Sequence, residues 1–104
     1  MSEYVKVTTL GEIPEGHAKI FEVDDSRVAL CKVNSQVYAL ADVCTHDGGP
    51  LGEGDLDGYE IICPRHGARF DVRTGAVLAF PAIVPVGTFP VKVEGEDVYV
   101  ALEE

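Results

Sequence analysis

Two short stretches decide the fold and chemistry of this chain: Cys44-Thr45-His46-Asp47-Gly48-Gly49-Pro50 and, after twelve residues, Cys63-Pro64-Arg65-His66-Gly67-Ala68-Arg69-Phe70-Asp71. Reduced to candidate ligands, they read C-x-H, a spacer of sixteen residues, and C-x2-H. Two of the three cysteines and two of the three histidines of the chain lie in these stretches. This concentration of thiol and imidazole groups predicts a metal or cluster site.

The length and composition set the scale of the fold. A chain of 104 residues is about the size of one small domain, so we expect residues 1–104 to form a single domain. A hydrophobic fraction of 46% is typical of a globular protein with a core of its own. Eleven glycines and six prolines indicate many turns, which favours short strands over long helices.

The charge and the termini bear on partners and location. Eighteen acidic against eight basic residues give a net charge of −10, which argues against nucleic acid and anionic lipid as partners. The acidity can steer the protein toward a basic partner, or it can serve solubility alone. Residues 1–6 lack the pattern of a signal peptide, and residues 76–87 are too short and proline-rich to span a bilayer. We therefore expect a soluble, cytoplasmic protein without membrane attachment, and a monomer.

Hydrophobic alternation predicts an all-β fold. Runs of β-forming residues predict strands at 4–8, 18–23, 27–33, 36–41, 59–62, 69–72, 76–78, 89–93 and 98–102. Turn residues at 24–26 and 34–35 predict antiparallel hairpins, whereas residues 11–16, 51–58 and 79–87 are expected to be loops. No segment shows helical periodicity over ten residues. The prediction is an antiparallel β-sandwich or barrel that carries a small two-loop subdomain at about residues 43–80.

The four candidate ligands fit two kinds of site. Two thiolates and two imidazoles can hold zinc tetrahedrally, or they can hold a 2Fe–2S cluster with sulfur on one iron and nitrogen on the other. Zinc sites usually group like ligands, whereas here each loop offers one cysteine and one histidine, which favours the cluster. We also expect Gly48, Gly49 and Gly67 to let backbone N–H groups approach the sulfurs.

The motifs Cys44-Thr45-His46 and Cys63-Pro64-Arg65-His66-Gly67 closely resemble those of the Rieske 2Fe–2S proteins. Gly75 after Phe70-Asp71, and the loop at Pro81, also resemble the Rieske layout. The resemblance implies a Rieske-like antiparallel β fold with one 2Fe–2S cluster per chain. It further implies that Cys44 and Cys63 bind the inner iron, while His46 and His66 bind the outer, more exposed iron.

The departures from one Rieske branch are informative. Respiratory Rieske proteins resemble this chain but carry a further cysteine in each loop, at the positions of Gly49 and Arg65, and these cysteines form a disulfide. The same branch has hydroxyl groups at the positions of Ala68 and Phe70, where they donate hydrogen bonds to sulfur. Fewer donors stabilise the reduced state less, so we expect a potential near the low end of the Rieske range, roughly −150 mV.

By this resemblance the chain is similar to the soluble Rieske ferredoxins of bacterial ring-hydroxylating dioxygenase systems. We therefore expect a one-electron carrier between an NAD(P)H-dependent flavoprotein reductase and a terminal oxygenase, with no catalytic residue of its own. Three alternatives remain open at this point. They are the small subunit of a cytoplasmic NAD(P)H nitrite reductase, a Rieske protein of another redox or iron–sulfur assembly pathway, and a zinc module without redox function.

The remaining residues with chemical potential have simpler interpretations. Cys31 lies in an apolar run, which predicts a small buried side chain on a strand. His17 has no partner nearby in the sequence and is expected on a surface loop. The apolar residues of the Pro81 loop, Pro81, Ala82, Ile83 and Pro85, fit either a lid and docking patch or ordinary core closure. The acidic residues Asp47, Glu53 and Asp55 are expected to be solvated, with basic partner residues as the alternative.

Overall fold

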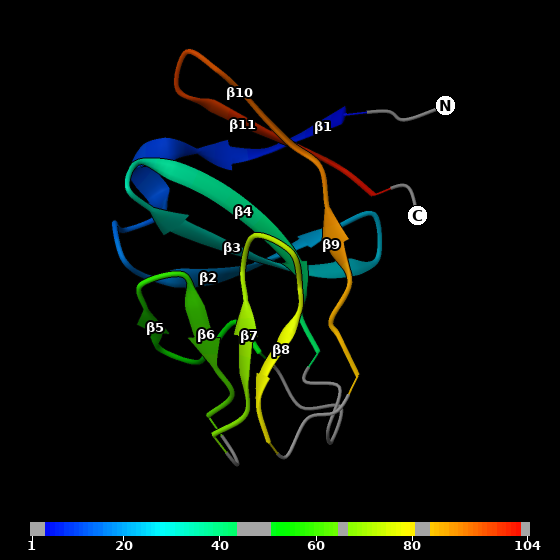
Figure 1. Cartoon of the computed structure of the whole chain (residues 1–104). Coiled ribbons are helices and arrows are strands. Elements are labelled where there is room, and N and C mark those ends of the chain that lie inside the picture. The colour runs from blue at the N-terminus through cyan, green and yellow to red at the C-terminus, as the bar shows by residue number, and fades with distance from the viewer. Residues whose placement is uncertain (1–3, 44–50, 65–66, 81–83, 103–104) are drawn as a thin grey trace.

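Three antiparallel β-sheets make up the computed structural model of the chain, which describes residues 4–43, 51–64, 67–80 and 84–102. The only helix among these residues is a short 3-10 turn, η1 (Leu10–Glu12). Figure 1 shows the sheets stacked, with the strands labelled in chain order. The prediction of an all-β, antiparallel fold is therefore confirmed. No helix in the described part of the chain is long and apolar enough to cross a membrane.

The sheets draw their strands from different parts of the sequence. Sheet A contains, in spatial order, β1 (Tyr4–Thr9), β11 (Asp97–Ala101) and β10 (Val91–Glu94). Sheet B contains β2 (Ala18–Val23), β3 (Ser26–Val33), β4 (Gln36–Ala41) and β9 (Thr88–Phe89). Sheet C contains β5 (Leu56–Asp57), β6 (Glu60–Ile62), β7 (Arg69–Asp71) and β8 (Val77–Ala79), within the range of the predicted two-loop subdomain.

Sheet B is the middle layer, and both of its faces are buried. In β3, Val28 and Leu30 pack into one apolar cluster together with Val98 and Val100 of sheet A. The intervening Ala29 and Cys31 pack into a second cluster with residues of sheet C. Because successive side chains of a strand point to opposite faces, an uninterrupted apolar run serves both clusters at once. All four residues from Val28 to Cys31 are fully buried.

Two tight turns fix the register of sheet B. Val23 pairs with Ser26 and Val33 pairs with Gln36, so each hairpin has a loop of two residues. Asp24 and Asp25 in the first loop, and Asn34 and Ser35 in the second, all have positive φ angles between 47° and 68°. Two successive positive φ values are the signature of a type I′ turn, whose twist matches that of the flanking strands. The predicted hairpins are confirmed.

Three local features differ from the prediction. The strand expected at 89–93 is divided at Pro90, because the chain leaves β9 in sheet B and enters β10 in sheet A there. Proline lacks the N–H group of a central ladder position, so it suits such a crossover. Residues 51–58 were expected to be a loop, but Leu56–Asp57 pair with β6 through the tight turn at Gly58, whose φ is +62°. The 3-10 turn η1 was not expected either.

Replacement of Ser35 by glycine is expected to stabilise the protein. Ser35 has φ +66°, a region that costs non-glycine residues about 1 kcal/mol, and glycine enters it freely. The larger entropy of glycine in the unfolded chain reduces the gain. We therefore expect the free energy of unfolding, measured by urea denaturation, to rise by about 0.5 kcal/mol. Ser35→Ala is the matched control, because it removes the same hydroxyl without relieving φ. Equal stability of the two variants would contradict the strain at this turn.

Candidate functional site

The predicted site lies at one end of the strands of sheet C, and this end of the sheet is here called an edge. Ile62, at the end of β6, pairs with Arg69 at the start of β7, and Arg69 pairs with Ala79 at the end of β8. These three residues form one row across the sheet. The residues that follow β6 and β8 and precede β7 therefore all leave from the same edge, which lies away from sheets A and B in Figure 1. Cys63 is the first residue beyond β6 at this edge.

Cys63 is the predicted ligand that lies within the described residues, and it is buried. Its exposed fraction is 1%, and it belongs to the apolar cluster between sheets B and C, together with Leu51, Ala68 and Phe70. Its N–H group donates to the carbonyl of Ala68 at 2.7 Å, and its own carbonyl accepts from the N–H group of Gly67 at 3.0 Å. This backbone pairing fixes the cysteine at the end of β6, and the apolar cluster shields its side chain from water.

The expected approach of backbone N–H groups to the sulfurs at Gly67 stays a prediction. In this structure the N–H group of Gly67 donates to the carbonyl oxygen of Cys63. Gly67 has a φ angle of +78°, which glycine adopts more readily than any other residue, and the chain turns back into β7 there. The other two glycines of that expectation, Gly48 and Gly49, lie outside the described residues.

The other predicted ligands, Cys44, His46 and His66, lie outside the described residues, as do Gly49 and Arg65. Their assignment as ligands therefore stays a prediction, and so does the pairing of the two loops around a metal centre. Among the described residues, no group of three or more His, Cys, Asp and Glu side chains is placed to hold a metal ion. Ala68 and Phe70 are both fully buried beside Cys63.

The third cysteine is a different kind of residue. Cys31 lies in the middle of β3 with an exposed fraction of 0%, as its apolar surroundings predicted. Burial raises the pKa of its thiol to about 12. A metal ligand must be a thiolate, and this thiol stays protonated and uncharged at neutral pH. The prediction for Cys31 is confirmed, and so is the surface position of His17, which is exposed.

Asp42 is a residue near the site that the sequence analysis missed. It directly follows β4 and is the one buried charged residue in the described part of the chain. Its Oδ1 atom accepts hydrogen bonds from the N–H groups of Leu51 at 2.9 Å and Gly52 at 2.7 Å. Its Oδ2 atom lies 3.0 Å from Nη2 of Arg27. A carboxylate in a D-V-C sequence gives no signal by itself that it is buried.

The contacts of Asp42 are of the kind that a buried charge requires. Removing a carboxylate from water costs several kcal/mol, and hydrogen bonds to a charged group return about 1.5–3 kcal/mol each. Oδ2 has no hydrogen bond among the described residues, so its contact with Arg27 is an ion pair without hydrogen-bond geometry. The carboxylate is therefore held mainly through Oδ1.

Apolar side chains are exposed beside the Cys63 edge. Phe80, directly after β8, has 81% of its surface exposed, and Leu78 has 47%. Arg69 pairs with Ala79 but Phe70 pairs with Val77, which makes Leu78 the extra residue of a β-bulge. Bulges commonly redirect side chains next to functional sites. A shallow hollow of about 230 Å³ is lined by Val77, Leu78, Ala79 and Phe80.

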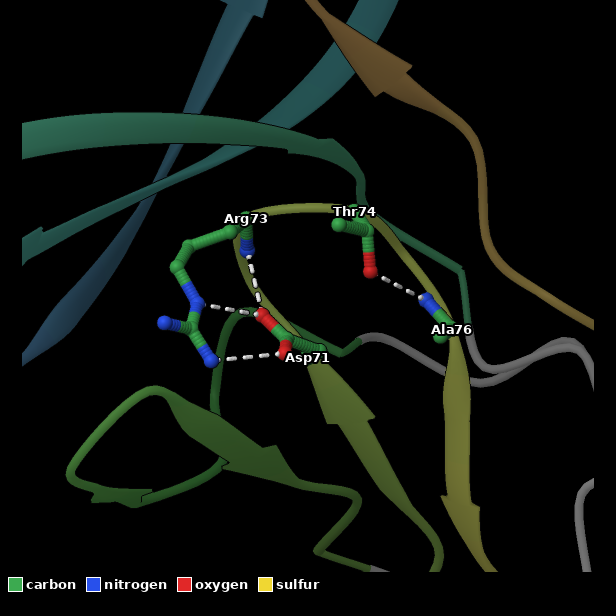
Figure 2. Close-up of polar contacts among 4 residues, drawn as sticks. All are labelled: Asp71, Arg73, Thr74 and Ala76. Carbon is green, nitrogen blue, oxygen red and sulfur yellow. Dashed lines mark hydrogen bonds and ion pairs between the residues drawn. The ribbon is translucent and has the colours of Figure 1, made fainter.

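The opposite edge of sheet C is closed by polar contacts. In the turn from β7 to β8, the carboxylate of Asp71 accepts hydrogen bonds from the N–H group and the guanidinium of Arg73, and Thr74 Oγ1 accepts from the N–H of Ala76 (Figure 2). Chiefly through the guanidinium of Arg73, these contacts lower the pKa of Asp71. Gly75 in this turn is required for close packing, because a Cβ atom there would lie 2.1 Å from the carbonyl oxygen of Val86.

Comparison with known proteins identifies the family. Residues 3–90 match the family model of the Rieske [2Fe-2S] domain. The chain belongs to the Rieske [2Fe-2S] domain family. The resemblance seen in the sequence is thereby confirmed, and so is the 2Fe–2S cluster as its cofactor. The zinc alternative loses its support. The thiol-bearing Cys63, buried at the loop edge, fits this cofactor, because a Rieske cluster takes cysteine thiolates as the ligands of one iron.

Two ferredoxin components of dioxygenase systems match this chain over nearly their whole length. The ferredoxin component of a naphthalene 1,2-dioxygenase system from Pseudomonas aeruginosa is 39% identical over 100 residues, which are 96% of each chain. The ferredoxin component of biphenyl 2,3-dioxygenase from Rhodococcus jostii (strain RHA1) is 40% identical over 98 residues, 94% of this chain and 92% of the relative.

Solved structures agree. The ferredoxin of carbazole 1,9a-dioxygenase from Nocardioides aromaticivorans IC177 superposes with a TM-score of 0.92 at 37% identity and covers 96% of this chain and 98% of its own. A putative NADH-dependent nitrite reductase small subunit from Mycobacterium tuberculosis superposes with a TM-score of 0.88 at 20% identity, over 100% of this chain and 98% of its own. The second likeness shows the shared fold alone.

Substitution of the two described cysteines should separate ligand from core residue. We expect Cys63→Ala to abolish the visible absorption of the cluster and to reduce iron and acid-labile sulfide per chain to near zero. Cys31→Ala should retain both, with a loss of stability of about 1 kcal/mol from the small cavity in the core. Full iron content in Cys63→Ala, or cluster loss in Cys31→Ala with the fold intact, would contradict these roles.

Proposed function

We propose that this Rieske protein is a one-electron carrier of a ring-hydroxylating dioxygenase system. It takes electrons from an NAD(P)H-dependent flavoprotein reductase and delivers them to a terminal oxygenase that hydroxylates aromatic rings. The observation that carries the proposal is the similarity of this chain to ferredoxin components of naphthalene and biphenyl dioxygenase systems. The identity is 36–40% over nearly the full length of this chain and of each relative. The proposal includes a cytoplasmic, monomeric protein.

A solved complex supports the oxygenase as a partner. The ferredoxin in a complex of reduced oxygenase and oxidised ferredoxin of carbazole 1,9a-dioxygenase superposes with a TM-score of 0.89 at 39% identity. This chain covers 94% of that ferredoxin. By contrast, this chain matches only 30% of the terminal oxygenase of carbazole 1,9a-dioxygenase from Nocardioides aromaticivorans IC177. The two superpose with a TM-score of 0.86 at 25% identity. The likeness of this chain is therefore closer to the carrier than to the oxygenase.

The residues of the chain divide the work of electron transfer. Cys44, His46, Cys63 and His66 are proposed to hold the 2Fe–2S group, which when bound supplies a one-electron redox couple. The apolar cluster around Cys63 excludes water from the sulfur side of the site. Ala68 and Phe70 present no hydroxyl there, which is consistent with the low potential predicted from the sequence. The chain itself carries out no bond chemistry.

The exposed apolar residues beside the site are proposed to contact the partner. Phe80 and Leu78 lie beside the edge at which Cys63 follows β6, and they offer apolar surface that a protein partner can cover. The acidic surface of the chain complements a basic partner surface and accelerates encounter at low ionic strength. Contact at this edge brings the partner to the side of the molecule where Cys63 is held.

Reconstitution tests the proposed function. With NADH, a flavoprotein reductase and a terminal oxygenase of a naphthalene dioxygenase system, the oxidised visible bands should bleach only when the reductase is present. They should return on addition of the oxygenase with aromatic substrate and oxygen, with product formed in proportion to electrons delivered. Re-oxidation only by a sirohaem nitrite reductase subunit would support the alternative instead. A colourless protein with stoichiometric zinc would rule out every redox function.

Phe80 provides a sharper test of the docking edge. Phe80→Ser should raise the KM of the oxygenase for this carrier about tenfold, equivalent to about 1.4 kcal/mol, because a large apolar contact is lost. The cluster spectrum and reduction potential should not change. Val93→Ser is the matched control, since Val93 is 43% exposed on β10 of sheet A, away from the site. Equal KM values for the two variants would place docking elsewhere.

A further inference from the structure

The two ends of the first ligand loop meet at one carboxylate. Asp42 precedes the segment 43–50, which contains Cys44 and His46, and Leu51 and Gly52 follow it. Oδ1 of Asp42 accepts hydrogen bonds from the N–H groups of both later residues, at 2.9 and 2.7 Å. The donors lie nine and ten positions after the acceptor in the sequence, so these bonds close the base of the loop.

Asp42 is itself fixed to the middle layer. Its N–H group donates to the carbonyl of Arg27 at 3.1 Å, which extends the pairing of β3 and β4 by one step. Its side chain is fully buried, and the guanidinium of Arg27 lies 3.0 Å from Oδ2. Arg27 is half-exposed and reaches the carboxylate from the surface. The loop base is thereby attached to the most buried strand of the protein.

The far side of the loop base has no room to shift. A Cβ atom on Gly52 would lie 2.5 Å from Cγ1 of Ile20 and 3.2 Å from Oδ1 of Asp42, so only glycine brings its N–H group this close. Its neighbour Leu51 is fully buried in the same apolar cluster as Cys63. Leu51, whose N–H group donates to Asp42, therefore also packs in the cluster that contains Cys63.

We propose that Asp42 is a positioning residue for the cluster: it closes the first ligand loop at its base and so fixes Cys44 and His46 relative to Cys63. The proposal rests on the assignment of Cys44, His46, Cys63 and His66 as ligands. A buried carboxylate suits this role because, once out of water, it must keep its hydrogen-bond donors. Loss of the charge weakens the contacts of both N–H groups at once and so releases Leu51 and Gly52 from Asp42.

The test compares Asp42→Asn with Asp25→Asn in the cluster-loaded protein. Asparagine keeps the volume of the side chain but makes weaker, uncharged hydrogen bonds and turns an amide toward Arg27 or toward the two N–H groups. We expect the rate of cluster loss in excess EDTA to rise at least tenfold. The visible circular dichroism and the EPR signal of the reduced cluster should also change. Asp25 is an exposed turn residue with φ +68°, a conformation that asparagine adopts readily, so its variant controls for the lost charge.

A second set of variants tests the contact between Asp42 and Arg27. Arg27→Gln leaves the buried carboxylate without its cation, so it should also accelerate cluster loss. The double variant Arg27→Gln/Asp42→Asn should lose its cluster more slowly than the sum of the single effects predicts, because no unpaired buried charge remains. Additive effects of the two substitutions would contradict the pairing. Asp42→Asn conserves volume, so its folding can be verified by far-UV circular dichroism before the cluster is examined.

The outcomes distinguish this proposal from the one on which it rests. Wild-type spectra and a wild-type rate of cluster loss in Asp42→Asn, even with a lowered unfolding temperature, would overturn the positioning role and leave the electron-carrier function intact. Absence of a 2Fe–2S spectrum from the wild-type protein would overturn both. Faster cluster loss with altered spectra in Asp42→Asn, but not in Asp25→Asn, is the result that supports the role of Asp42.

Discussion

Burial of both faces of β3 is the constraint on which the rest of the structure depends. The run Val28–Cys31 has no exposed surface, because sheet A covers one face and sheet C covers the other. Neither outer sheet is large. In sheet C, β6, β7 and β8 have three residues each and β5 has two. Small sheets of this kind need a partner layer to be stable. The middle sheet supplies it, and the loop edge of sheet C is held in place by this packing together with its own backbone hydrogen bonds.

Attachment of the site to β3 follows from the same packing. Cys63, Leu51 and Ala29 share one apolar cluster, and Asp42 joins the end of β4 to Leu51 and Gly52. At the opposite end of sheet C, Tyr59 connects sheets C and B, since its hydroxyl accepts a hydrogen bond from Nδ2 of Asn34, in the β3–β4 turn, at 2.9 Å. Within sheet C, the guanidinium of Arg73 lies over the ring of Tyr59. Sheet C is thus attached to sheet B at both ends of its strands.

Much of this could be predicted from the sequence. Strands with clear alternation and two-residue turns, such as β2, β3 and β4, were predicted within one residue of their bounds, because local pattern and turn chemistry agree there. The family and its cofactor were indicated by the resemblance of the motifs around Cys44, His46, Cys63 and His66 to those of Rieske proteins. What the sequence could not indicate depends on contacts between distant segments. The burial of Asp42, the crossover at Pro90 and the approach of Gly75 to Val86 all involve partners brought together only by the fold.

The pairing of β1 with β11 has a practical consequence for protein engineering. Tyr4 lies opposite Ala101, so the first and last strands are neighbours in sheet A, on the side of the molecule away from the loop edge of sheet C (Figure 1). Another polypeptide, such as a reductase domain or an affinity tag, can be fused through a flexible linker at either terminus without covering the Cys63 edge. Because Tyr4 and Ala101 are neighbours, the fold is also a candidate for circular permutation with the Cys63 edge left unaltered.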